Sequence, residues 1–162
     1  MVMLIDKLCD LLEKITFIAI VILLAAMLGV AWAHVFCRYV LGSSLFWSEE
    51  MLRFSLVWFA LLSASLIFRR KKHLGIILLV EKLPINLQNV ISTAIIYIFL
   101  VINIVVTIQG IDLLGRVHAQ LTPALRIPVS LPYASVPVSF LLMTIYSISD
   151  IFHQFAKKEK AS

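Results

Sequence analysis

Four long apolar runs constrain this chain of 162 residues more than any other feature. They cover residues 15–36, 51–68, 90–109 and 131–152. An α-helix of about 18 to 22 residues rises roughly 27 to 33 Å, which matches the ~30 Å hydrocarbon thickness of a bilayer. Hydrophobic residues make up 62% of the sequence and charged residues 14%, and a soluble domain could not bury that much apolar surface. We therefore expect an all-α integral membrane protein, a single membrane domain over residues 1–162 with four transmembrane helices.

The basic residues are divided unequally between the two ends of these runs. Four crossings place both chain termini on one side of the membrane. Ten bases fall on that side: Lys7, Lys14, Arg69, Arg70, Lys71, Lys72, Lys82, Lys157, Lys158 and Lys160. Arg38, Arg116 and Arg126 fall on the other side, with Arg53 just inside the membrane. Because cytoplasmic loops carry the excess of Lys and Arg, we predict cytoplasmic N- and C-termini, and the net charge of +5 reflects topology rather than nucleic-acid binding.

The segments outside the four runs are short. Residues 1–14 space leucines at helical intervals among charged residues, which predicts an amphipathic lead-in that lies on the membrane surface or extends the first helix. A secretory signal peptide fits less well, because acidic residues precede the first run and no clear small-residue cleavage site follows it. The basic block 69–72 and His73 stop the second helix. Residues 74–83 are too few to cross, so we expect a short interfacial helix there and a cytoplasmic tail at 153–162.

The second run carries the most unusual polar pattern. Trp47, Glu49 and Glu50 stand at its start, Arg53 lies one turn inside, and Trp58 follows. Arg53 could extend to the interface, or pair with a glutamate three or four residues earlier and simply settle the end of the helix. Alternatively, the two glutamates and the arginine form a polar cluster that joins this helix to a neighbour or a partner subunit. A proton or ion relay is a third interpretation, and the tryptophans would set the depth of the helix.

Other polar residues have structural explanations. Ser48 is placed to cap the second helix, because its hydroxyl can accept a free backbone N–H. Asn103 lies near the middle of the third run, where a hydrogen bond to another helix is expected. Residues 110–132 predict a long loop punctuated by prolines. Pro137 falls in the opening turns of the fourth helix, where a missing N–H costs less than in the middle.

The sequence offers no basis for catalysis. It contains no glycine-rich phosphate loop, metal-ligand cluster or nucleophile motif, and the two cysteines are expected to be small fillers. We therefore expect no enzyme activity, no cofactor, and no catalytic, substrate-binding or metal site in this chain. Two pairs of histidines, His34 with His118 and His73 with His153, could ligate the haems of a b-type cytochrome, but His73 and His118 lie outside the predicted helices. A self-sufficient four-helix proton-coupled transporter that uses Glu50 is the other alternative.

An ordered set of short motifs resembles a known family. The set is Arg38-Tyr39, Ser44-Leu45, Trp47-Ser-Glu-Glu50, Arg53, Val57-Trp58, Arg69, His73, Pro123-Ala-Leu-Arg-Ile-Pro128, Tyr133 and Pro137-Val138. Together these motifs resemble the small membrane (Q) subunit of tripartite ATP-independent periplasmic (TRAP) transporters, along nearly the whole chain. One departure is Ser63-Ala64-Ser65, where such subunits commonly have a glycine followed by small residues. Serine is still small enough for close helix packing.

The resemblance implies a Na⁺-coupled transporter of the bacterial inner membrane that imports an organic acid, such as a C4-dicarboxylate or sialic acid. It implies two partners: a large multi-span (M) subunit, which would hold the Na⁺ and substrate sites, and a periplasmic substrate-binding protein. This chain would then be a static scaffold beside the M subunit, in contact with membrane lipid. The outer loops 38–50 and 110–132 would help to dock the binding protein, with Glu49, Arg116 and Arg126 as candidate contacts.

Overall fold

The computed structural model describes residues 2–43, 45–71 and 85–159, with side chains placed for 5–43, 45–70, 91 and 94–152. Its elements are α1 (Val2–Tyr39), α2 (Ser48–Lys71), α4 (Ile85–Val117), the short α5 (Ser130–Tyr133) and α6 (Ser135–Glu159). Four helical segments are long and apolar enough to cross a membrane: Ile5–Tyr39, Ser48–Arg70, Ala94–Val117 and Ser130–Phe152. The described residues form no strand beyond one isolated bridge, so the all-α class with four transmembrane helices is confirmed. The interfacial helix predicted at 74–83 lies outside the described residues.

The first helix continues through the predicted lead-in. α1 is one helix of 38 residues, about 57 Å long at roughly 1.5 Å per residue, so it extends beyond the hydrocarbon layer. Asp10 and Glu13 on this extension form ion pairs with Arg69 and Arg70 of α2. Because the extension has a partner within the chain, it continues the helix instead of lying on the membrane surface. This is the second of the two alternatives that the sequence left open.

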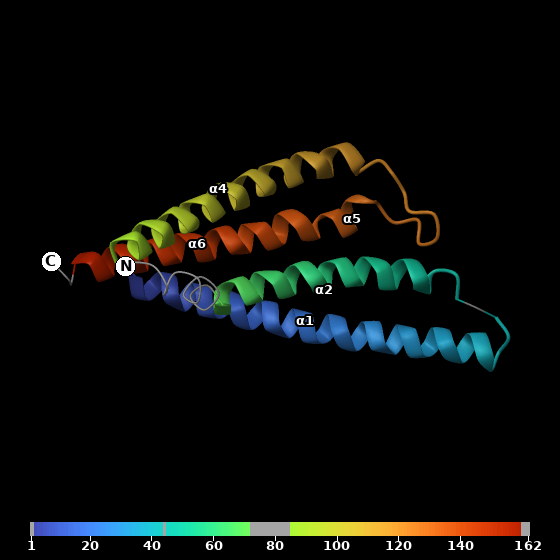
Figure 1. Cartoon of the computed structure of the whole chain (residues 1–162). Coiled ribbons are helices and arrows are strands. Elements are labelled where there is room, and N and C mark those ends of the chain that lie inside the picture. The colour runs from blue at the N-terminus through green and yellow to red at the C-terminus, as the bar shows by residue number, and fades with distance from the viewer. Residues whose placement is uncertain (1, 44, 72–84, 160–162) are drawn as a thin grey trace.

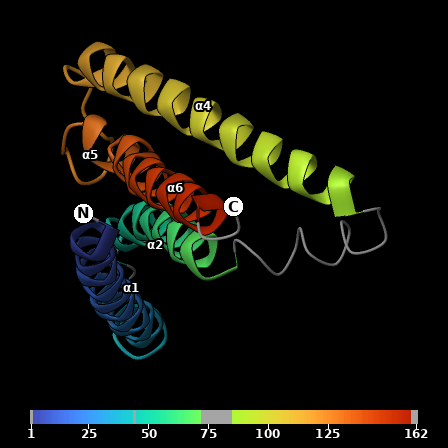
Figure 2. The same cartoon turned by 90° about the vertical axis from the view of Figure 1, so that its left-hand side faces the viewer.

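α6 is the central helix of the molecule. It packs against α1, α2 and α4, whereas α1 packs on α2 and α6, and α4 packs mainly on α6 (Figure 1). Seen from the side, α1, α2 and α6 form one group, and α4 lies along the outside of α6 with its N-terminal half diverging from the others (Figure 2). The chain is therefore an open array of helices rather than a closed four-helix bundle.

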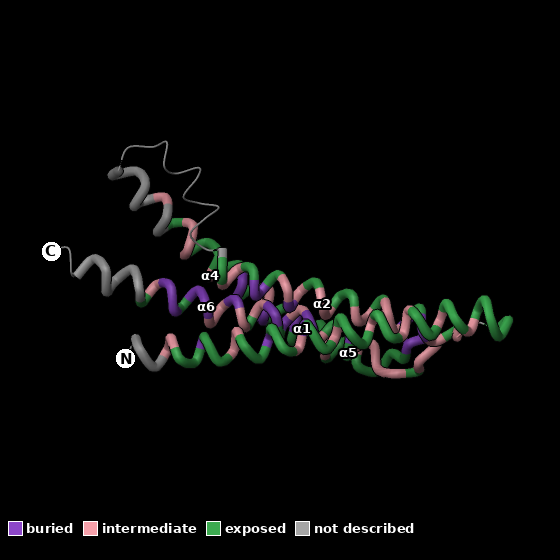
Figure 3. The backbone as a smooth tube through the Cα atoms, turned by 90° about the horizontal axis from the view of Figure 1, so that it is seen from below, coloured by how far each residue is buried: buried purple, intermediate pink, exposed green. Residues whose placement is uncertain are grey.

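Burial follows this arrangement. Half of the α6 span is buried inside the chain, against 17% of the α2 and α4 spans and 11% of the α1 span. Figure 3 shows the buried residues gathered along α6 and the helix faces beside it. Four serines of α6 are at most 1% exposed: Ser135, Ser139, Ser147 and Ser149. Small side chains let helix backbones approach closely in a membrane, which explains why α6 occupies the centre.

α4 and α6 approach closely at Gly110. A Cβ atom added there would lie 3.1 Å from Cδ and 3.3 Å from Cβ of Pro137. Pro137 is the third residue of α6, in the opening turn as predicted, where its missing N–H removes little helical bonding. The missing side chain of Gly110 therefore lets the proline ring pack directly on the α4 backbone.

The bounds predicted for the loop, residues 110 and 132, are wrong at both ends. α4 continues to Val117, and the Arg116 guanidinium donates to the Asp112 carboxylate one turn earlier at 2.7 Å. An opposite-charge pair at this spacing stabilises an exposed helix end, so the helix extends past the apolar run that marked it in the sequence. At the other end, α5 takes up residues 130–133.

Candidate functional site

The connection between α4 and α5 contains a compact hairpin at residues 120–129. Thr122 N donates to Ile127 O at 2.9 Å, and Ile127 N donates to Thr122 Oγ1 at 3.2 Å. The turn closes through Arg126, whose N–H donates to Thr122 O at 3.1 Å and whose φ is 51°. A left-handed φ is uncommon for a residue other than glycine, so this turn needs support from elsewhere in the chain.

Glu50 at the start of α2 provides that support. Its Oε2 atom accepts hydrogen bonds from the backbone N–H of Ala124 at 2.9 Å and of Leu125 at 2.7 Å. Glu50 is only 9% exposed. Hydrogen bonds to a carboxylate are roughly twice as strong as those between neutral groups. The carboxylate therefore holds the turn of the 120–129 hairpin against α2.

Arg53 pairs with neither glutamate, so the intrahelical ion pair, one of the interpretations that the sequence left open, is not formed. The Glu50 carboxylate is bonded to the hairpin instead, because two backbone N–H groups point directly at it. Arg53 and Glu49 are both exposed, and neither side chain forms an ion pair or hydrogen bond with a residue that the structure describes. A charge facing lipid costs up to ~3 kcal/mol at the bilayer centre and less near its edge, so Arg53 requires an acceptor from water, lipid or another chain.

Ser48 joins the C-terminal end of α1 to the N-terminal end of α2. Its Oγ donates to Leu45 O at 2.6 Å and shares a hydrogen bond with His34 Nδ1. The predicted N-cap role is wrong, because the turn before α2 brings the Leu45 carbonyl within reach of this hydroxyl, and Ser48 N donates to the same carbonyl at 3.2 Å. Trp47, the preceding residue, is half-buried.

Ion pairs join α1 and α2 at their other ends. Arg70 Nε lies 2.8 Å from Glu13 Oε1, and Arg69 Nη2 lies 3.3 Å from Asp10 Oδ1. The Arg69 guanidinium also lies 5.7 Å from the centroid of the Tyr146 ring on α6. Exposed pairs of this kind contribute about 0.2–1 kcal/mol each. Two residues that the sequence singled out for topology thus also connect three helices.

The remaining residues predicted to set topology are placed only in part. Arg38 is exposed near the end of α1, with its guanidinium 6.0 Å from the centroid of the Tyr39 ring. Lys71 belongs to α2, but its side chain, like the whole of Lys72 and His73, lies outside the described part of the chain.

Comparison with known proteins identifies the family. The family model described as "Tripartite ATP-independent periplasmic transporters, DctQ component" matches residues 27–157, which include α2, the 120–129 hairpin and most of α6. The chain belongs to this family. The resemblance to TRAP Q subunits is thereby confirmed, and the DctQ-family chain is a transporter component rather than an enzyme. With four membrane-spanning helices, it is a multi-pass protein of the bacterial inner membrane.

Two relatives show how much of the DctQ-family chain is shared. It is 30% identical to the sialic acid TRAP transporter small permease protein SiaQ of Vibrio cholerae over 149 residues, which cover 88% of this chain and 82% of the relative. It is also 30% identical to the isethionate TRAP transporter permease protein DctMQ of Oleidesulfovibrio alaskensis over 110 residues, which cover 67% of this chain and 17% of the relative. The chain therefore spans less than one fifth of the isethionate permease.

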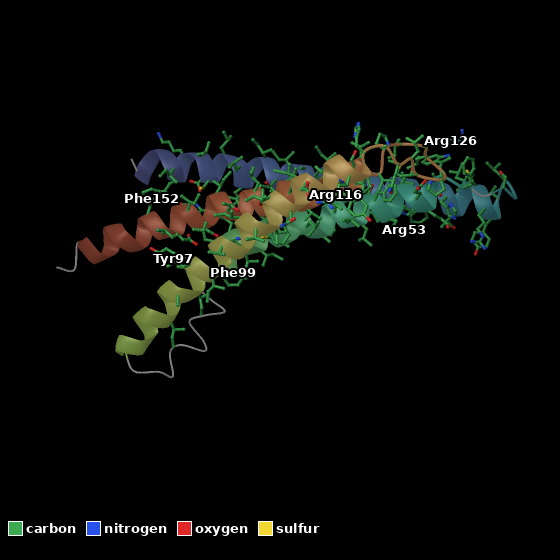
Figure 4. All side chains as sticks on the ribbon, turned by 90° about the horizontal axis from the view of Figure 1, so that it is seen from above. Arg53, Tyr97, Phe99, Arg116, Arg126 and Phe152 are labelled. Atoms are coloured by element: carbon green, nitrogen blue, oxygen red, sulfur yellow. The ribbon has the colours of Figure 1, made fainter. Side chains whose placement is uncertain are left out.

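The candidate docking residues of the DctQ-family chain lie toward one end of the molecule. Figure 4 shows Arg53, Arg116 and Arg126 toward the end opposite Phe152. Arg116 is bonded to Asp112, whereas the exposed Arg126 side chain has no ion pair with a described residue. This end therefore presents unpaired charges of both signs, since Glu49 is exposed there too.

Two polar side chains in the spans of the DctQ-family chain form hydrogen bonds between helices. Asn103 Nδ2 donates to Ser147 Oγ on α6 at 3.4 Å, which confirms the predicted bond between helices. Trp58 Nε1 donates to Leu131 O at 3.2 Å, so its indole joins α2 to α5. The sequence did not reveal this contact, since tryptophan near a helix end is equally typical of a lipid interface.

Sequence reasoning also missed the bond from Glu50 to the 120–129 hairpin. Two signals were present: an acidic residue at the start of a helix, and a motif with prolines at Pro123 and Pro128, which donate no N–H and leave the intervening amides to find acceptors. Neither signal says that the two segments meet. That pairing depends on where α2 and α6 place their outer ends.

Proposed function

We propose that this chain is the small membrane subunit of a TRAP transporter and supports a separate, large multi-span M subunit that carries the solute. Family membership supports this role. The name of the isethionate relative, DctMQ, contains both M and Q, the letters used for the large and small membrane subunits. The match to this chain accounts for 17% of that relative. Most of the relative is therefore available for a much larger membrane component. In the system of this chain, a partner would supply that component.

The low burial of three of the four spans carries the proposal. A carrier that works alone must enclose a polar path, yet only 11–17% of the α1, α2 and α4 spans is buried inside the chain. At the α4–α6 contact, the Asn103 side chain forms a hydrogen bond with Ser147 of the same chain. Glu50, the proton site of the self-sufficient alternative, already accepts two backbone N–H groups. These features favour a support over a carrier.

The distribution of charge supports an orientation with both termini in the cytoplasm. The 120–129 hairpin and Glu49 would then face the periplasm, where a substrate-binding protein approaches. In this arrangement the Glu50 contact holds the hairpin rigid, and the exposed charges of Glu49, Arg116 and Arg126 contribute to docking. Mutually complementary charges favour the correct orientation during such an encounter.

The transported solute is proposed to be a small organic anion. One relative is named for isethionate, a sulfonate, and the other for sialic acid, a carboxylate. A C4-dicarboxylate belongs to the same class. Coupling to Na⁺ would take place in the M subunit, and the small subunit itself would hold neither Na⁺ nor solute.

Reconstitution tests the proposal. The M subunit would be placed in proteoliposomes with and without this chain, together with the binding protein and a Na⁺ gradient, and uptake of labelled isethionate, sialic acid and succinate measured in turn. We expect uptake only when both membrane subunits are present. Uptake by this chain alone, or full-rate uptake by the M subunit without it, would contradict the proposal.

Charge reversal tests the docking residues separately. Arg116→Glu and Arg126→Glu are expected to lower uptake while the membrane complex still assembles, with the loss largest at low ionic strength. Glu49→Lys is expected to lower uptake as well. Lys157→Glu, on the tail predicted to be cytoplasmic, is the control and should leave uptake unchanged. Normal uptake by all three outer variants would remove docking from the proposed role.

A further inference from the structure

One side of α2 is left uncovered by the residues that the structure describes. Its exposed residues are Glu49, Arg53, Leu56, Val57, Ala60, Ala64 and Ile67. At about 100° per residue, these positions fall within an arc of roughly 100°. They therefore form one continuous stripe along the helix, the α2 face, while the other sides of α2 pack on α1 and α6.

Arg53 distinguishes the α2 face from the other outward surfaces. Many exposed positions of the α1 and α4 spans are large and apolar, such as Ile22 and Ile98, although α1 also exposes small residues at Ala25, Gly29 and Ala33. Residues 15–36 and 94–111 contain no Asp, Glu, Lys or Arg. Lipid tails can cover those two surfaces without removing water from a charge. The α2 face instead presents a guanidinium one turn inside the apolar run, with no acceptor among the described residues.

The pattern of charge favours a protein partner over a lipid headgroup. Glu49 lies one turn before Arg53 on the same face, and both are exposed. A purely anionic headgroup could bond to the guanidinium, but it brings no donor for Glu49 and would be repelled by that carboxylate. A protein segment can place an acid opposite Arg53 and a hydrogen-bond donor opposite Glu49, so it can satisfy both residues at once.

The middle of the α2 face is built for close helix contact. Ala60 and Ala64 are one turn apart, and both are exposed. Small residues four apart let a second helix approach closely, which is how helices associate in membranes where lipid already satisfies apolar side chains. The alanine pair begins about 10 Å from Arg53, so one straight helix can contact all three residues.

We propose that the α2 face receives a transmembrane helix of the M subunit. A carboxylate on that helix bonds to the Arg53 guanidinium near the outer end, and its backbone packs on Ala60 and Ala64. The inference rests on the proposed function and deepens it, because it names the helix at the subunit contact. Lipid covers the outward surfaces of α1 and α4.

Photo-crosslinking in the assembled complex tests the face. Benzoylphenylalanine would replace Ala60, and the matched controls are Ala25 on α1 and Ala94 on α4, which are exposed alanines in apolar parts of spanning helices. We expect a crosslink to the M subunit from position 60 and none from positions 25 and 94. Crosslinks from a control position and none from position 60 would overturn the assignment of the α2 face as the subunit contact, while leaving the proposed function intact. Failure of the wild-type chain to co-purify with the M subunit would overturn both.

Substitution of Arg53 tests the charge contact. Arg53→Ala should lower recovery of the M subunit with this chain at least about tenfold, as expected when one partner of a desolvated charge pair is removed. Arg53→Lys should restore part of the loss. The purified chain alone should keep its melting temperature, because Arg53 has no partner among the residues that the structure describes. Full recovery with Arg53→Ala would mean that the guanidinium only extends to headgroups, and would overturn the contact.

Discussion

A single carboxylate fixes the shape of a loop more than 70 residues away in the sequence. Glu50 accepts the N–H groups of Ala124 and Leu125, and the turn it holds includes Arg126 at a φ of 51°. Glu50 therefore holds the turn of the 120–129 hairpin in place. The equally acidic Glu49 beside it is exposed.

We expect Glu50→Ala to release the turn. Loss of two hydrogen bonds to a charged group should lower the free energy of unfolding in detergent by about 2–4 kcal/mol. Hydrogen exchange at the amides of Ala124 and Leu125, measured by mass spectrometry, should become faster. Glu49→Ala is the control and should change stability by less than about 0.5 kcal/mol. Unchanged protection of the two amides in Glu50→Ala would contradict this account.

Gly110 makes a second single-residue prediction. Gly110→Ala forces a methyl group against the Pro137 ring, so it should lower the free energy of unfolding by about 1–3 kcal/mol. Gly115→Ala, on the same helix with nothing within 4 Å of the added atom, should be neutral or stabilising by up to about 1 kcal/mol. Thermal unfolding of both variants in detergent gives the comparison. Equal behaviour of the two variants would rule out a tight contact at Gly110.

At the scale of elements, the pairing of α1 with α2 depends on charge at one end and on Ser48 with His34 at the other. The charged end can be tested by a double-mutant cycle on Glu13 and Arg70. Glu13→Arg and Arg70→Glu should each destabilise the chain, and the double variant should recover part of the loss. We expect a coupling free energy of about 0.2–1 kcal/mol that falls as salt is raised. A coupling that is zero at low salt would show that the extension of α1 is held by packing alone.

At the scale of the whole molecule, the open arrangement explains why most of the spanning surface remains available to lipid and to a partner. The orientation of the chain in the membrane can be tested by cysteine labelling. In a chain whose Cys9 and Cys37 are replaced by serine, a cysteine at Ala119 should react with an impermeant maleimide in intact cells. A cysteine at Ala161 should react only after the membrane is opened, because the bases beside it favour the cytoplasm. The reverse labelling pattern would invert the proposed orientation.

The sequence by itself determined the number of membrane spans and the family. A bilayer requires about 20 consecutive apolar residues for each crossing, so run length alone is a reliable signal. The basic residues predict which side the termini occupy, because a charged segment resists transfer across the membrane. Ordered motifs from Arg38 to Pro137 carried the resemblance to TRAP Q subunits, and the matched region 27–157 includes them.

Only the tertiary structure decided which helix is central, which side of α2 is free, and what Glu50 and Arg53 contact. All four runs are mainly apolar, so hydrophobicity alone does not distinguish a buried face from one that faces lipid. Hydrogen bonds depend on atomic positions, and the meeting of α2 with the 120–129 hairpin follows from the packing of both α2 and α4 on α6. That packing gives the glutamate its partners within the chain and leaves the arginine without one among the described residues.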